Sequence, residues 1–172
     1  MAVRVGVLVD VPPPWRDVLH RHRVAAGDAL AAEVPPHLTL LPPARLPAEA
    51  LDALDAHLAG VAARTAPFTL RLAGTGTFRP VTDVVYVRVA DGDRHARALA
   101  GAVAAFAALE PESAYPYHPH VTVAHQVPPA ALDAAAAALA AFAAAFPVTG
   151  FALYVQDAGG AWRPRRDYGL AG

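Results

Sequence analysis

Histidine and threonine occur in the same short pattern at two places in the chain, PHLTL at residues 36–40 and PHVTV at residues 119–123. In each copy the apolar residues alternate with His and Thr, which is the period of a β-strand. The apolar side chains are therefore expected to face a core, and the His and Thr side chains to face away from it. Positions i and i+2 of a strand lie about 6.6 Å apart, so an imidazole and a hydroxyl can reach one bound group.

Two such strands facing each other would place four polar side chains around one small space: His37, Thr39, His120 and Thr122. Imidazoles have an unperturbed pKa of about 6.5, so one can accept a proton while the other donates one near neutral pH. Threonine hydroxyls can donate hydrogen bonds to negatively charged oxygens. The plainer alternative is that all four are ordinary strand residues, since Thr is common in strands.

A metal site is a further alternative at the second motif. His118 shares the strand parity of His120 and Thr122, and the His-x-His spacing could hold zinc or another divalent ion. The chain has no cysteine, and neither motif strand carries a carboxylate. We therefore expect no bound metal, and we place His118 at the rim of the site.

Composition narrows the class of protein. Hydrophobic residues make up 55% of the 172 residues and charged residues 17%, which indicates a globular domain rather than a disordered chain. Proteins that coat long nucleic acids carry a large positive charge, so the net charge of -1 argues against that class. All 14 basic residues are Arg, the residue that grips phosphate with two parallel donors.

The location of the protein is also constrained. The apolar run at residues 3–9 is too short for a signal peptide, and the Ala-rich segment at residues 130–146 is interrupted by Asp133. The absence of cysteine is compatible with a reducing compartment. We therefore expect a cytoplasmic protein with no membrane segment and no obligate protein partner.

The elements that must position the two motifs follow from hydrophobic periodicity. Strands are predicted at residues 3–9, 36–40, 67–78, 84–89, 119–123, 148–156 and 161–169. Helices are predicted from near Trp15, from Pro47, from Asp93 to Leu109 and from Pro129 to Ala145. In the first helix Leu30 is expected to face inward and Arg23 to face solvent.

The order of these elements repeats. The number of residues from Val3 to His37 is nearly the same as that from Val84 to His120, and the sequence ALDA follows each motif. We infer a duplicated strand-helix-strand-helix-strand unit, roughly residues 1–80 and 84–157, within a single bilobal domain at residues 1–172.

Two His-x-Thr motifs, each preceded by Pro and each opening a strand in a duplicated α/β chain, resemble the motifs of the 2H phosphoesterases. These include the bacterial RNA 2′,3′-cyclic phosphodiesterases, also called 2′-5′ RNA ligases. The resemblance covers nearly the whole chain. It implies an α+β fold with pseudo-twofold symmetry, in which two antiparallel sheets line a central cleft and helices pack outside.

The resemblance also implies an activity. It suggests metal-independent, cofactor-free hydrolysis of 2′,3′-cyclic phosphates at RNA or nucleotide ends to 2′-phosphates, with 2′-5′ RNA ligation in reverse. His37 would be the acid and His120 the base, although the pseudosymmetry leaves these roles exchangeable. Thr39 and Thr122 would bind phosphate. The residues that could contact the rest of the substrate are His125, Tyr117, Phe78 and Arg79.

Two departures from the RNA-directed members stand out. The first motif is followed by Leu41-Pro42-Pro43 instead of an aromatic residue and Leu-Gly, and the second ends in His125 where an Arg is frequent. Three other functions therefore stay open. They are a module that binds a phosphorylated nucleotide end without turnover, a phosphodiesterase for another cyclic phosphate such as that of ADP-ribose, and a metal-dependent hydrolase built on His118 and His120.

Overall fold

A computed structural model describes all 172 residues of the chain. Its strands form one hydrogen-bonded sheet in the order β7-β3-β4-β6-β2-β1-β8-β9, and a short strand, β5, pairs with β2 outside this path. Every neighbouring pair is antiparallel. The expected α+β class is therefore confirmed.

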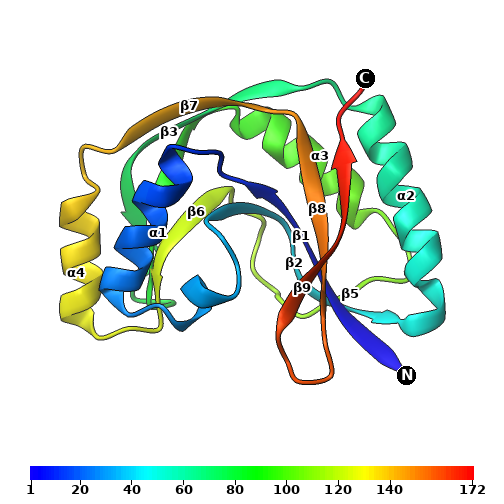
Figure 1. The fold of residues 1–172 in the computed structure, drawn as a ribbon, viewed down its shortest axis with the longest axis horizontal. Coiled ribbons are helices and arrows are strands. Elements are labelled where there is room, and N and C mark those ends of the chain that lie inside the picture. Colours follow the sequence, from blue (N-terminus) through cyan, green and yellow to red (C-terminus); the bar gives the residue numbers. More distant parts are fainter.

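The strands and helices alternate along most of the chain (Figure 1). The strands are β1 (Ala2–Asp10), β2 (His37–Pro47), β3 (Phe68–Thr77), β4 (Val84–Asp91), β5 (Glu110–Pro111), β6 (His120–His125), β7 (Ala143–Val148), β8 (Gly150–Gln156) and β9 (Trp162–Gly169). The helices are α1 (Trp15–Ala26), α2 (Leu51–Arg64), α3 (Asp93–Ala104) and α4 (Pro129–Ala138). None of them is long and apolar enough to cross a lipid bilayer.

The sheet has two lobes that meet at β2 and β6. One lobe contains β2, β1, β8 and β9, and the other contains β6, β4, β3 and β7. The ladder between β2 and β6 consists of a single pair, Leu38 with Val121. The two expected sheets are thus the two halves of one sheet, and they separate on either side of this pair.

Helices cover the outside of each lobe, as expected. Helices α1 and α4 pack against β6, whereas α3 packs against β2 and α2 against β9. In Figure 1, α1 and α4 lie on the left, α3 near the centre and α2 on the right. Helix α1 follows a strand of one lobe but covers the other, and α3 does the reverse. Each lobe is therefore completed by a helix from the other half of the chain.

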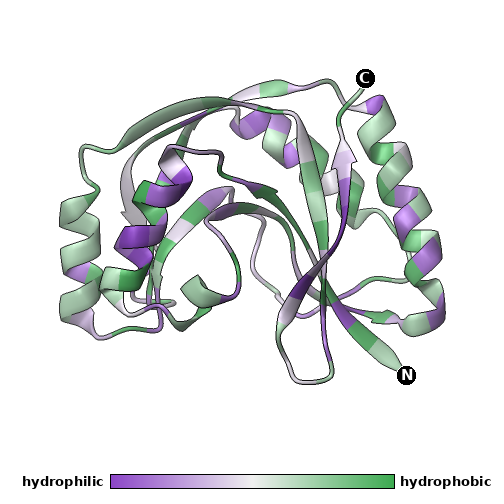
Figure 2. Ribbon diagram, viewed as in Figure 1, coloured by the Kyte–Doolittle hydropathy of each residue, from purple (hydrophilic) through white to green (hydrophobic).

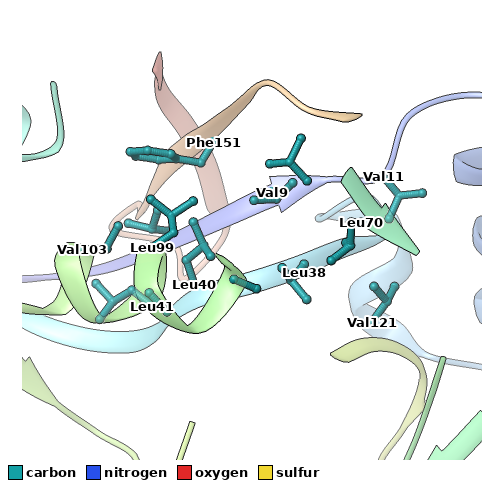
Figure 3. Close-up of a cluster of buried hydrophobic side chains, with 14 of the residues drawn as sticks. Val9, Val11, Leu38, Leu40, Leu41, Leu70, Leu99, Val103, Val121 and Phe151 are labelled. Atoms are coloured by element: carbon teal, nitrogen blue, oxygen red, sulfur yellow. The ribbon is translucent and has the colours of Figure 1, made fainter. Parts of the chain in front are cut away.

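A single cluster of 37 buried residues fills the space between sheet and helices in both lobes. Figure 3 shows Leu38, Leu40 and Val121 within it, close to residues of α3 and β3. Figure 2 shows the corresponding polarity, with hydrophobic colour along most strands and hydrophilic segments on α1. The apolar residues of both motifs therefore anchor their strands in the same core.

Strand β2 is longer than predicted, because it continues to Pro47 instead of ending before Pro42. Its register against β1 shifts between the pairs Val7–Leu41 and Val5–Ala44, so Pro42 and Pro43 lie in a bulge. Prolines are tolerated there because a bulged residue need not donate to the ladder. Pro47 is the N-cap of a 3-10 turn, Ala48–Ala50, which runs directly into the second helix at Leu51, so Pro47 opens this helical segment as predicted.

The predicted helix from Pro129 to Ala145 is wrong in its second half. Helix α4 ends at Ala138, and Ala143–Val148 forms β7, which pairs with β3. Alternate residues of β7, Ala144, Phe146 and Val148, are buried, which is the period of a strand. Helix α3 likewise ends at Ala104, before the predicted Leu109.

Candidate active site

The single pair between the lobes orients both motifs. Leu38 and Val121 stand opposite each other, and both are completely buried. Paired residues of an antiparallel ladder point to the same face, so the residues on either side of each point to the opposite face. His37, Thr39, His120 and Thr122 therefore share the face away from the core, where all four are half-buried.

The spacing within this group suits one small ligand. The residues that flank a paired position stand across from each other, so His37 faces Thr122 and Thr39 faces His120. His37 and His120 are diagonal neighbours, and such positions lie about 7–8 Å apart. The two imidazoles are close enough for the charge of a protonated His120 to lower the pKa of His37. A tetrahedral group can thus contact an imidazole and a hydroxyl from each lobe.

Each motif histidine is held by a carbonyl two residues before it. The Nδ1 of His37 lies 2.8 Å from the carbonyl oxygen of Pro35, and the Nδ1 of His120 lies 2.6 Å from that of His118. Because a carbonyl oxygen can only accept, Nδ1 carries the proton in both rings. The Nε2 of each ring is then free to accept a proton when the ring is neutral or to donate one when it is charged.

Both imidazoles favour the neutral form. Burial lowers the pKa of His37 to about 4; the bond to Pro35 opposes this shift, and the nearby charges of Arg23 and His120 add to it. Burial also lowers the pKa of His120, as does the neighbouring charge of His118. A negative charge in the space between the rings would favour the protonated form of either one.

Aromatic rings surround His120. The ring of Phe78 meets it edge-on with centroids 4.9 Å apart, and the ring of Tyr86 lies 5.3 Å away. Phe78 and Tyr86 also pack on each other at 4.6 Å. Gly76 makes this possible, because a Cβ at that position would lie 2.7 Å from the Tyr86 ring. Phe78, expected to contact substrate, thus also packs against a catalytic candidate.

An unexpected buried ion pair lies beneath His37. Arg23, expected to face solvent, is only 2% exposed, and Leu30, expected to face inward, is 39% exposed. The Nη1 of Arg23 donates to the carbonyl of Val34 at 2.7 Å, and its Nε lies 3.5 Å from the Asp28 carboxylate. Arg23 thereby fixes the chain just before Pro35, whose carbonyl orients His37.

The other three residues predicted to contact substrate, Tyr117, Arg79 and His125, contact other parts of the protein. The hydroxyl of Tyr117 donates to the backbone carbonyl of Thr39 at 2.8 Å. Arg79 forms an ion pair with Asp133 at 2.8 Å. His125 stands opposite Val84 at the far end of β6. The structure therefore brings Tyr117 and Phe78 to the motif residues, while Arg79 and His125 lie farther along the same lobe.

A metal site built on His118 and His120 would need at least one more ligand. The ring centroids of His118 and His120 are 5.9 Å apart. No group of three His, Cys, Asp or Glu side chains is placed to hold a metal ion.

A hollow of about 390 Å³ opens beside His120 on the β6 lobe. The residues that line it include Thr75, Thr77, Tyr86, Arg88 and His118. Tyr86 stands opposite Thr122 and Arg88 opposite His120, so both share the face of the motif residues. Sequence reasoning missed these two residues. Their alternation with Val85 and Val87 indicates which face of the strand they share, but not that β4 pairs with β6.

Known proteins with similar sequences indicate the family of this chain. A model of the 2′-5′ RNA ligase superfamily matches residues 11–160. A protein of Bacillus licheniformis, named as a candidate phosphoesterase, is 26% identical over 129 residues, covering 73% of this chain and 72% of that protein. A Bacillus cytotoxicus protein described in the same way is 43% identical over 58 residues, and this chain spans only 34% of its length in the match.

Solved structures show the same fold. Escherichia coli LigT in its apo form superposes with a TM-score of 0.68 at 26% identity, with 100% of this chain and 99% of that one covered. A Thermus thermophilus protein gives a TM-score of 0.67 at 27% identity, with 98% of each chain covered. E. coli LigT has also been solved with 3′-AMP and with ATP.

The family match extends over both motifs and nearly all the strands and helices between them. The resemblance inferred from the two His-x-Thr motifs is thereby confirmed. The chain belongs to the 2′-5′ RNA ligase superfamily, a group of the 2H phosphoesterases.

Proposed function

We propose that this phosphoesterase hydrolyses 2′,3′-cyclic phosphates, at RNA or nucleotide ends, to 2′-phosphates. The observation that carries the proposal is the Leu38–Val121 pair, which turns one imidazole and one hydroxyl from each lobe toward a shared space. A cyclic phosphate carries a negative charge, which favours protonation of an imidazole whose pKa is lowered by burial. The nucleotides bound by E. coli LigT are of the same chemical class.

The reaction needs one base and one acid on opposite sides of phosphorus. One imidazole takes a proton from water, whose oxygen bonds to phosphorus. The bond between phosphorus and the ribose 3′ oxygen breaks, and the other imidazole gives that oxygen a proton. The products are a 2′-phosphate and a free 3′-hydroxyl. Thr39 and Thr122 donate hydrogen bonds to the phosphate oxygens, where negative charge concentrates.

The pKa of His37 favours one division of roles. His37, with its pKa of about 4, is neutral over nearly the whole working range and is ready to accept a proton. Assigning it as the acid would require its ring to be protonated at neutral pH, well above that pKa. We therefore assign His37 as the base and His120 as the acid, the reverse of the order that the resemblance alone suggests.

The test is incubation with a 2′,3′-cyclic nucleotide monophosphate, with and without a chelator, followed by identification of the product isomer. We expect a 2′-phosphate in both conditions. A 3′-phosphate would contradict the proposed leaving group, and loss of activity with chelator would favour a metal-dependent hydrolase. Tight binding of a 2′-phosphate without turnover would favour a binding module. A parallel incubation with the cyclic phosphate of ADP-ribose tests the other substrate class.

A further inference from the structure

A hollow lined by an exposed arginine, Arg88, lies beside the proposed catalytic centre. We propose that Arg88 binds a second phosphate of the substrate, the one attached to the 5′ oxygen of the nucleotide that carries the cyclic phosphate. This inference rests on the proposed function and names which cyclic phosphates the site prefers. It is carried by the 390 Å³ hollow and by the position of Arg88 within it.

The hollow continues directly from the catalytic candidates. Arg88 stands opposite His120 in the ladder between β4 and β6, and such neighbours have Cβ atoms about 4.5–5.5 Å apart. Tyr86 and His118, whose ring centroids lie 5.3 Å and 5.9 Å from that of His120, line the hollow on the side of His120. A ligand held at His120 can therefore extend into the hollow without leaving the protein surface.

Arg88 is the free cation of this hollow. Its side chain is exposed, and it takes part in none of the ion pairs of the protein. Asp93, the one carboxylate that lines the hollow, is paired with Arg97 at 2.8 Å. A guanidinium presents several donors in a planar fork that matches two oxygens of a phosphate.

The hydroxyls that line the hollow are already engaged. Thr75 donates to the carbonyl of Ala136 at 3.1 Å, and Thr77 donates to that of Val84 at 2.8 Å. These two hydroxyls line the hollow, but their hydrogens already form hydrogen bonds with backbone carbonyls and are not available to a ligand. Recognition of an anion in this hollow therefore falls to Arg88.

The assignment of roles places a specific phosphate there. If His120 protonates the departing 3′ oxygen, the ribose lies on the His120 side of phosphorus. The 5′ oxygen of that ribose, and the phosphate on it, then extend into the same lobe, where Arg88 stands. That phosphate is either the diester that joins the preceding nucleotide of an RNA or a 5′-phosphomonoester, and the two share the chemistry that Arg88 recognises.

The experiment compares three substrates. They are a cyclic mononucleotide with a free 5′-hydroxyl, the same nucleotide with a 5′-phosphate, and a dinucleotide that ends in the cyclic phosphate. We expect kcat/KM for one or both of the phosphate-bearing substrates to exceed that for the plain nucleotide by about tenfold or more, as a charge-assisted hydrogen bond gives. The arm with the larger gain identifies the diester or the monoester as the source.

Arg88→Gln and Arg21→Gln make a matched pair. Each removes one exposed arginine, and Arg21 lies on α1, outside the hollow. Arg88→Gln should bring the ratio of kcat/KM values close to one, and Arg21→Gln should keep the wild-type ratio. Thermal unfolding of both variants checks that they fold, and Arg88→Lys provides a second substitution that retains a point charge and part of the preference.

The outcomes separate this inference from the function on which it rests. Hydrolysis of all three substrates at equal rates by the wild type would overturn the Arg88 site and leave the phosphodiesterase standing. A preference that survives Arg88→Gln would also overturn it. Hydrolysis of none of the three would contradict the proposed function itself.

Discussion

The hydroxyl of Tyr117 donates a 2.8 Å hydrogen bond to the backbone carbonyl of Thr39. Tyr117 lies three residues before His120, so this bond joins the loop that leads into the second motif to the strand of the first. Only one ladder pair connects β2 with β6. The Tyr117 bond is therefore a second fixed point between the two halves of the site.

Tyr117→Phe should lower both stability and activity. Loss of this part-buried bond should reduce the free energy of unfolding by about 0.5–1.5 kcal/mol, and it should lower kcat by loosening the position of Thr39. Denaturant unfolding and kcat measurements check this. Tyr115→Phe is the matched control, because Tyr115 is 65% exposed. Equal behaviour of the two variants would show that the Tyr117 hydroxyl does not brace the site.

The dependence of kcat/KM on pH should be bell-shaped, with its maximum on the acidic side of neutrality. The base must be neutral, so activity rises as pH passes the pKa of His37, about 4. The acid must be protonated, so activity falls as pH passes the pKa of His120, which burial lowers from 6.5. Initial rates from pH 3.5 to 9 measure both limbs. A maximum above pH 8 would contradict these two pKa shifts.

Arg23→Met should be strongly destabilising. It leaves the Asp28 carboxylate buried without its cation, and breaking a buried pair in this way costs about 3–5 kcal/mol. Adding Asp28→Asn should recover part of that loss, because the Asn side chain keeps an acceptor for the Leu30 amide that Asp28 now binds. Denaturant unfolding gives the values, with Arg21→Met on the same helix as control. A loss of less than about 1 kcal/mol for Arg23→Met would refute the pair's structural role.

Gly76→Ala should disturb His120 through Tyr86. The new methyl would lie 2.7 Å from the Tyr86 ring, which must then move from its place against His120. We expect lower thermal stability and lower kcat. Gly101→Ala on α3 is the control, because its Cβ meets nothing within 4 Å and should stabilise the helix by about 0.5–1 kcal/mol. Unchanged kcat in Gly76→Ala would show that His120 does not depend on this packing.

The motif strands could be predicted from the sequence because strand alternation is a local property. Leu38 and Val121 fix the faces of their strands wherever the chain lies, and both are buried as expected. The Ala-rich strand β7 could not be predicted, since Ala favours helices and only pairing with β3 draws residues 143–148 into a strand. Here a tertiary partner overrides the local preference.

The surroundings of the site were less predictable than its centre. Arg23 was expected to face solvent because charged residues in amphipathic helices normally do, and its burial depends on Asp28 and Val34 folding back over it. Arg88 belongs to the site only because β4 pairs with β6. No spacing within the sequence reports that pairing.

The proposed reaction depends most on acid-base catalysis shared by His37 and His120. The direct measurement is kcat/KM on a 2′,3′-cyclic nucleotide for His37→Gln and His120→Gln, with His22→Gln on α1 as control. Removing a general acid or base should cost about a hundredfold or more in each motif variant, while His22→Gln should match the wild type. A loss below about tenfold in both motif variants would contradict the two-histidine mechanism.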